Sequence, residues 1–162
     1  MHDHVSVRVV DYLSPKDRVA LVSLLDMYAR DPMGGGKPLA VDVQARLCDD
    51  LAGLAGAVSF IAWLDNRPIG LLNAMRAYST FKARPLMNVH DIAVAPDCRG
   101  KGVGRALLAA LEQHAVQSGC CKLTLEVLSG NCLALQAYTG FGFEHYALDP
   151  EAGQALFMQK WL

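Results

Sequence analysis

The chain contains the stretch Arg99-Gly100-Lys101-Gly102-Val103-Gly104-Arg105, which is rich in glycine and in basic side chains. The apolar run before it, Val89 to Val94, predicts a β-strand, and the run Val103 to Val116 predicts a helix. Glycine lets a backbone pass close to a ligand, and the first turn of a helix offers unpaired N–H groups at the positive end of its dipole. The stretch therefore predicts a loop that binds a pyrophosphate.

Two familiar phosphate-binding patterns fit this loop poorly. The Walker pattern needs a glycine five positions before Gly-Lys, where this chain has Ala95. The dinucleotide pattern GxGxxG needs a glycine where Arg105 stands, although Glu126 follows at about the usual distance of some twenty residues. What remains is the pattern Arg-x-x-Gly-x-Gly at Arg99, Gly102 and Gly104.

This pattern and a second one resemble a known enzyme family. The stretch from His90-Asp91-Ile92-Ala93-Val94 through the loop to Leu108 closely resembles the acetyl-CoA-binding motif of the Gcn5-related N-acetyltransferases, the GNAT family. Further on, Asn131-x-x-Ala134-x-x-x-Tyr138-x-x-x-Gly142-Phe143 resembles a later segment of the same family. The resemblance implies an α/β fold with a mixed, splayed central sheet of about seven strands, flanked by about four helices.

Hydrophobic periodicity predicts the order of elements β-α-α-β-β-β-α-β-α-β-β, which has the seven strands and four helices that the resemblance implies. The first helix starts at Ser14-Pro15, where a capping hydroxyl precedes a proline. The connector Asp31 to Pro38 contains two prolines and three glycines, so we expect it to be mobile and to close over a small acceptor. The expected strands are 5–10, 59–64, 69–78, 86–94, 122–127, 142–146 and 155–162.

Composition favours one domain that spans residues 1–162. The chain is 52% hydrophobic, enough to bury the core of a single domain of this length. The formal net charge is -1 and Lys and Arg are scattered, so nucleic acid is not expected as a main partner. There is no apolar run of membrane-spanning length and no signal-peptide pattern at the N-terminus, so we expect a cytoplasmic protein with no membrane partner.

No metal site is expected. The five cysteines contain no CxxC pair, which argues against both a zinc site and a disulfide framework. The group His2-Asp3-His4 lies at the chain terminus, where fraying is more common than metal binding.

The resemblance implies how acetyl-CoA is bound. The loop Arg99 to Arg105 is expected to bind the pyrophosphate. The splay of the sheet leaves backbone groups unpaired, and those of Ile92, Ala93 and Val94 are expected to bind the pantetheine arm. Asn131, Ala134 and Tyr138 share one face of a short helix by their spacing, and we expect all three to contact the cofactor.

Acetyl transfer to an amine needs a neutral nucleophile and a proton for the departing thiolate. Tyr138 is the expected general acid, since a phenol with an ordinary pKa of about 10 is protonated at neutral pH. Glu126 is the first choice as general base, because Leu-Glu-Val-x-x-x-Asn resembles bacterial enzymes that acetylate the N-terminus of a ribosomal protein. His90 is the alternative base.

The acceptor is predicted to be a small primary amine. The region from Tyr78 to Asp91 resembles the diamine acetyltransferases that act on spermidine and spermine, although His90 replaces an acidic residue there. We expect Tyr28, Asp31, His90 and Asp91 to bind the acceptor.

Two alternatives stay open. One is an enzyme that acetylates a protein N-terminus or a lysine, and the other is a non-catalytic acyl-CoA-binding module. The family resemblance also makes a homodimer a reasonable expectation.

Overall fold

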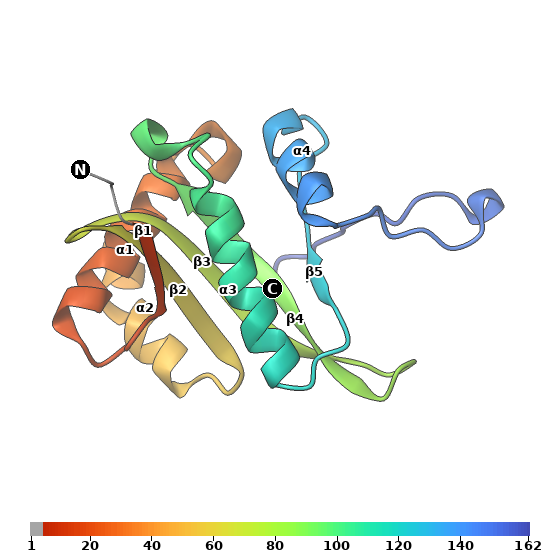
Figure 1. Ribbon diagram of the computed structural model, residues 1–162, viewed down its shortest axis with the longest axis horizontal. Coiled ribbons are helices and arrows are strands. Elements are labelled where there is room, and N and C mark those ends of the chain that lie inside the picture. The colour runs from red at the N-terminus through yellow and green to blue at the C-terminus, as the bar shows by residue number, and fades with distance from the viewer. Residues whose placement is uncertain (1–4) are drawn as a thin grey trace. The chain divides into compact units, whose positions relative to one another are not determined.

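The computed structural model describes residues 5–162, so His2-Asp3-His4 lies outside the described residues. Over this range the chain forms five strands and four α-helices, in the order expected from the sequence for the first nine elements (Figure 1). Its internal contacts divide into two compact units, one up to Leu125 and one from Glu126 onward. The expectation of a single domain covers both units and stays a prediction.

The first unit is built on a sheet with the strand order β1-β2-β3-β4-β5. The first four strands pair antiparallel with their neighbours, whereas β5 joins β4 in parallel, so the sheet is mixed as expected. The strands are β1 (Val5–Val9), β2 (Ala57–Leu64), β3 (Arg67–Ser79), β4 (Arg84–Val94) and β5 (Leu123–Leu125).

Helices cover both faces of this sheet, with α1 (Pro15–Arg30) and α2 (Val41–Gly53) on one face and α3 (Val103–Gln117) on the other (Figure 1). Gly70 of β3 faces α3, because an added Cβ would meet Val103 and Leu107 at 3.2 Å. The next residue in β3 points to the opposite face, as strand alternation requires. The expected start of α1 is confirmed, because the Ser14 hydroxyl accepts a hydrogen bond from the Asp17 N–H.

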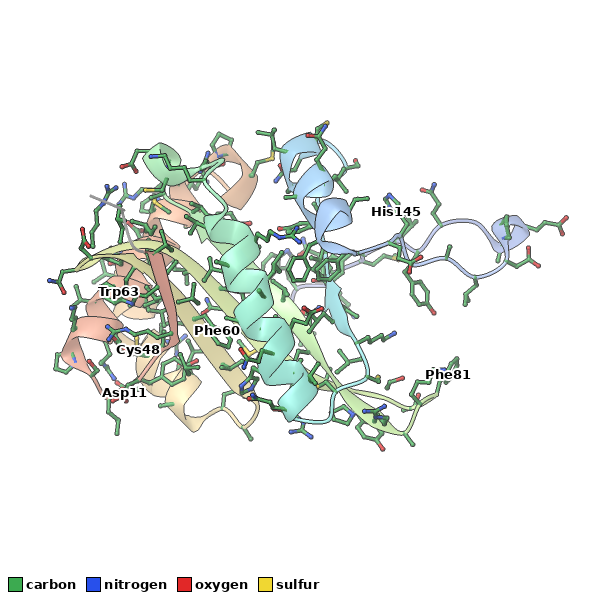
Figure 2. The ribbon with its side chains drawn as sticks, in the orientation of Figure 1. Asp11, Cys48, Phe60, Trp63, Phe81 and His145 are labelled. Atoms are coloured by element: carbon green, nitrogen blue, oxygen red, sulfur yellow. The ribbon has the colours of Figure 1, made fainter. Side chains whose placement is uncertain are left out.

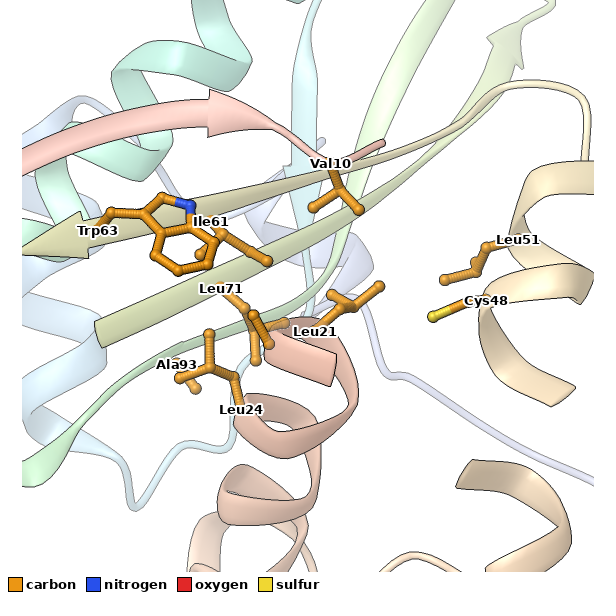
Figure 3. Packing of buried hydrophobic residues seen from close by; sticks show 10 residues of the cluster. Val10, Leu21, Leu24, Cys48, Leu51, Ile61, Trp63, Leu71 and Ala93 are labelled. Atoms are coloured by element: carbon orange, nitrogen blue, oxygen red, sulfur yellow. The ribbon is translucent and has the colours of Figure 1, made fainter. Parts of the chain in front are cut away.

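The core on the α1 and α2 face is apolar (Figure 3). Leu21 and Leu24 of α1 and Cys48 of α2 pack there against Leu71 and Trp63 of the sheet. On the α3 face, the Phe60 ring meets His114 edge to face at 6.0 Å (Figure 2). Two layers of helices therefore bury both faces of the strands.

Strand β4 has a bulge at His90. Asp91 pairs with Asn73 and Val89 pairs with Ala74, so His90 is an extra residue with no partner in β3. On its other side β4 pairs with β5 only from Met87 to Val89. Among the described residues, the remainder of β4 has β3 as its only strand neighbour, which agrees with the expected splay.

The expectation of seven strands is wrong for the described residues. Segments 142–146 and 155–162 form no strand, and the second unit contains only α4 (Cys132–Phe141) and a short 3-10 turn, Pro150–Ala152, as helical elements. Large apolar side chains of the last segment, such as Phe157 and Trp161, are exposed. An alternating or apolar run becomes a strand only where its backbone finds an edge to pair with, and these segments pair with none.

The connector after α1 is held by hydrogen bonds. The Asp31 carboxylate accepts from the Met33 N–H at 2.9 Å, and the Asp31 carbonyl accepts from the N–H groups of Gly34 and Gly36. Gly34 packs so closely that an added Cβ would overlap the Tyr28 carbonyl. The connector is thus a defined turn, and its closure over an acceptor stays a prediction.

Candidate functional site

The glycine-rich loop has the geometry of an anion site. Gly100 and Gly102 have φ of 73° and 81°, in the left-handed region that favours glycine. Gly102 is the N-cap of α3 and brings no side chain to cap the helix, so the N–H groups of the first turn have no capping side chain. An added Cβ at either glycine would meet nothing within 4 Å, which leaves open space for a ligand.

The entrance to this loop is anchored by an ion pair. Arg67, at the start of β3, donates two hydrogen bonds to the Asp97 carboxylate, at 2.7 and 2.8 Å. This contact holds the pKa of Asp97 below its ordinary value. The basic side chains of Arg99, Lys101 and Arg105 are all exposed around the loop.

Arg99 connects the loop to two other elements. Its Nε donates to the Val94 carbonyl at the end of β4, at 3.1 Å, and its guanidinium donates to Asp31 at 3.0 Å. The Met33 N–H first, and then Arg99, hold the pKa of Asp31 below its ordinary value. Asp31, predicted to bind the acceptor, is therefore paired with a residue predicted to bind the pyrophosphate.

The backbone of β4 alternates between its two edges. The Ala95 N–H donates to the Ile69 carbonyl, so the backbone groups of Ala95 are directed toward β3. Successive residues of a strand direct these groups to opposite edges, so the N–H and C=O groups of Val94 and Ile92 are directed away from β3, to the other edge of β4. That edge is where pairing with β5 has ended. Ile92 and Val94 thus direct their backbone polar groups to this edge, and their contact with pantetheine stays a prediction. Ala93 faces β3 by the same alternation, and its contact with a cofactor stays a prediction.

Three of the four predicted acceptor residues interact in the first unit. Tyr28 is half-buried, and burial raises the pKa of its phenol above the ordinary value. The carboxylates of Asp91 and Asp31 raise this pKa further, so both act on the same hydroxyl. His90 lies exposed at the bulge, immediately before Asp91.

Sequence reasoning missed a chain of polar side chains that ends at Asp91. The Asn73 amide donates to the Asp91 carboxylate at 2.9 Å, and its oxygen accepts from the Ser59 hydroxyl at 2.6 Å. The Ser59 oxygen lies 2.8 Å from the Tyr12 hydroxyl. The signal was present in the sequence, since Asn73 and Ser59 each interrupt an apolar strand run.

In the second unit, Asn131 caps α4, where its side-chain oxygen accepts from the Ala134 N–H at 3.2 Å. Tyr138 is half-buried, and its ring meets Phe143 edge to face at 5.9 Å. Glu126 is exposed and directly follows β5, which is shorter than predicted. The cofactor and catalytic roles of these residues stay predictions.

Within residues 5–162, no cluster of three or more His, Cys, Asp or Glu side chains has an arrangement that could hold a metal ion. None of the helices in the described chain has the length and apolar character needed to cross a bilayer.

A sequence profile of the acetyltransferase (GNAT) family matches residues 21–143. The chain is 36% identical over 100 residues to the streptothricin acetyltransferase of Streptomyces lavendulae, an alignment that covers 62% of this chain and 42% of that protein. It is 36% identical over 66 residues to the thialysine N-epsilon-acetyltransferase of Bos taurus, which covers 41% of this chain and 38% of the relative. The chain thus spans less than half the length of these curated relatives.

Solved structures share the fold. One is an aminoglycoside acetyltransferase, meta-AAC0020, from an uncultured soil metagenomic sample in complex with trehalose, with a TM-score of 0.81, 17% identity, and coverage of 99% of this chain and 98% of that one. Another is the aminoglycoside N-acetyltransferase AAC(6')-Iy in complex with CoA, with a TM-score of 0.77, 21% identity, and coverage of 99% and 97%. At these identities the likeness establishes the fold alone.

Proposed function

Because the chain belongs to the acetyltransferase (GNAT) family, we propose that it transfers the acetyl group of acetyl-CoA to a small primary amine. The observation that carries this proposal is that two features of the first unit, the open edge of β4 and the start of α3, follow each other closely along the chain. The uncapped, glycine-rich start of α3 suits a pyrophosphate, and the open edge of β4 that leads to it suits an extended amide chain. Coenzyme A consists of these two parts in this order.

The residues of the loop and strand divide the binding of acetyl-CoA between them. The N–H groups at Gly102 to Gly104, with Lys101 and Arg105, bind the pyrophosphate as charge-assisted donors. The backbone groups of Ile92 and Val94 pair with the amides of the pantetheine arm. Arg99 already donates to the Val94 carbonyl, so it shares or exchanges this contact when the cofactor arrives.

The reaction is direct attack of a neutral amine on the thioester carbonyl. An alkylammonium has a pKa near that of lysine, about 10.4, so a base must remove its proton at neutral pH. Glu126 or His90 takes this proton before the attack and releases it to solvent. The nitrogen loses a second proton after the new C–N bond forms, and this proton restores the phenol of Tyr138 once Tyr138 has protonated the thiolate. The C–S bond then breaks, and Tyr138 donates its phenolic proton to the thiolate of coenzyme A.

The acceptor is a cationic small molecule. The carboxylates of Asp91 and Asp31 both act on the Tyr28 hydroxyl, and they offer negative charge to an ammonium group. The relatives named above act on streptothricin, thialysine and aminoglycosides, and an amine of this kind is proposed here as well. The alternative of a protein N-terminus or lysine remains, as does a non-catalytic acyl-CoA-binding module.

A panel of acceptors tests the proposal. The purified protein is incubated with acetyl-CoA and one of spermidine, 1,4-diaminobutane, thialysine, sisomicin or a short peptide, and free thiol is followed with a thiol-reactive dye. Mass spectrometry then identifies the acetylated amine. Turnover on the small amines supports the proposal, turnover on the peptide alone favours the protein acceptor, and acetyl-CoA binding without any turnover favours the binding module.

A homodimer and a cytoplasmic location are proposed on the same family resemblance and composition. Both stay predictions. Light scattering of the purified protein gives the molar mass that tests the dimer.

A further inference from the structure

We propose that Asn73 is a positioning residue, which holds the Asp91 carboxylate so that its other oxygen faces the ammonium group of the acceptor. Ser59 and Tyr12 fix the orientation of the Asn73 amide. This inference rests on the proposed function, and it assigns a role in acceptor recognition to three residues that sequence motifs do not include.

The hydrogen bonds that link Tyr12, Ser59, Asn73 and Asp91 all run in one direction, with each residue donating to the next. Ser59 has one hydroxyl proton and donates it to the Asn73 oxygen at 2.6 Å, so its own oxygen accepts from the Tyr12 hydroxyl at 2.8 Å. The Asn73 nitrogen then donates to Asp91 at 2.9 Å. Turning the amide round would set its oxygen against a carboxylate, two acceptors facing each other. The row of hydrogen bonds therefore ends with a donor aimed at the Asp91 carboxyl group.

Tyr12 supplies the first proton of this chain. It is half-buried, and burial raises the pKa of its phenol above the ordinary value. A higher pKa keeps the hydroxyl protonated, so Tyr12 stays a donor at neutral pH. Because Tyr12 donates to Ser59, Ser59 donates to Asn73 and Asn73 donates to Asp91.

The burial of these groups argues for a role beyond filling the core. Ser59 is 1% exposed and Asn73 is 3% exposed, and Asp17 is the other buried polar or charged residue among those described. Polar groups in a core cost stability unless they are hydrogen-bonded, and apolar side chains would serve the packing. Their neighbours on the same sheet face, Ile61 and Leu71, are apolar and almost fully buried. A fully bonded polar chain instead specifies one geometry.

The position of Asp91 explains why its geometry needs support. It is the first paired residue after the bulge at His90, on a strand that has already lost β5 as a neighbour. Asn73 lies directly opposite Asp91 in β3, and Ser59 lies opposite Asn73 in β2. The three side chains therefore form a row across the sheet that reaches the carboxylate from the interior.

The test compares the variants N73L, D91N and N73L/D91N. We expect N73L to raise the KM for spermidine about tenfold, a loss of about 1.4 kcal/mol in binding, while the KM for acetyl-CoA stays within about twofold. In the D91N background, N73L should change the KM for spermidine by less than about twofold, because Asn73 acts through Asp91. Equal effects of N73L in both backgrounds would overturn the inference.

Controls separate positioning from loss of stability. Val58 precedes Ser59 in β2 and is buried on the opposite face, so V58A should lower the melting temperature without changing the KM for spermidine. Y12F removes the first donor of the chain and keeps the ring. If N73L does not fold, Y12F should still raise the KM for spermidine by about two- to threefold in the Asp91 protein and not in the D91N background.

Failure of this inference and failure of the proposed function give different results. If the protein acetylates amines and D91N leaves the KM for each of them unchanged, the proposed function stands and the positioning role falls. If no amine is acetylated, calorimetric titration of spermidine into the CoA-loaded protein replaces the kinetics. Binding that N73L and D91N weaken without additivity supports the inference, and absence of spermidine binding overturns it.

Discussion

The variant G102A separates the strain at the phosphate loop from its binding role. Gly102 has φ of 81°, and alanine in the left-handed region costs about 1 kcal/mol of folding free energy. An added Cβ would meet nothing within 4 Å, so no steric clash adds to this cost. The melting temperature should therefore fall by about 3 °C, as expected for a chain of this length.

Binding should fall by more than this strain predicts. The new methyl group enters the open space before the first turn of α3, where the proposed pyrophosphate lies. Loss of one charge-assisted hydrogen bond is worth about 1.5–3 kcal/mol, so the Kd for coenzyme A should rise by about ten- to a hundredfold. Isothermal titration calorimetry with coenzyme A measures this change directly.

Gly119 provides a matched control. It has φ of 71°, an added Cβ would also meet nothing within 4 Å, and it lies just after the other end of α3. G119A should therefore lower the melting temperature by a similar amount and leave the Kd for coenzyme A unchanged. The same Kd for both variants, whether raised or unaltered, would refute the assignment of the pyrophosphate to this loop.

Three further predictions concern other parts of the chain. Y138F should lower kcat about a hundredfold and leave the Kd for acetyl-CoA unchanged, because the variant loses only the proton donor; steady-state kinetics with calorimetry checks both values. Arg67 lowers the pKa of Asp97, so the ion pair contributes its stability above the ordinary carboxyl pKa of 3.8 and loses it as the pH falls below. Melting curves of R67Q and the unaltered protein should therefore differ near pH 7 and converge as the pH falls through the lowered pKa of Asp97. G34A should lower the free energy of unfolding by about 2 kcal/mol in urea titrations, because its Cβ would overlap the Tyr28 carbonyl, and an unchanged midpoint would contradict that packing.

Local signals in the sequence predicted most of the helices and strands correctly. Ser14 and Pro15 define the start of α1, and the glycines around Gly102 define the start of α3. Such signals lie within a few residues of the boundary that they determine, because capping and backbone conformation are local properties. The loop Arg99 to Arg105 closely follows the strand that ends at Val94, so the sequence could predict these two neighbouring elements together.

Pairing between distant segments could not be predicted in the same way. The bulge at His90 depends on which residues of β3 face β4, and the strand pattern of β4 alone suggests a regular alternation. The last segments of the chain carry an apolar pattern that predicted strands, yet they have no partner edge among the described residues. A strand is defined by its neighbour, so the count of strands is a property of the tertiary structure.

The amino-acid sequence by itself determined the glycine-rich loop, the order of the first nine elements and the resemblance to the GNAT family, because these depend on neighbouring residues. Only the tertiary structure decided which carboxylate the Asn73 amide holds, and we propose that this carboxylate is the one oriented for an acceptor. Tyr12, Ser59, Asn73 and Asp91 are far apart in the chain, and the order of β2, β3 and β4 sets the last three in one row. Their hydrogen bonds exist because the strands are adjacent.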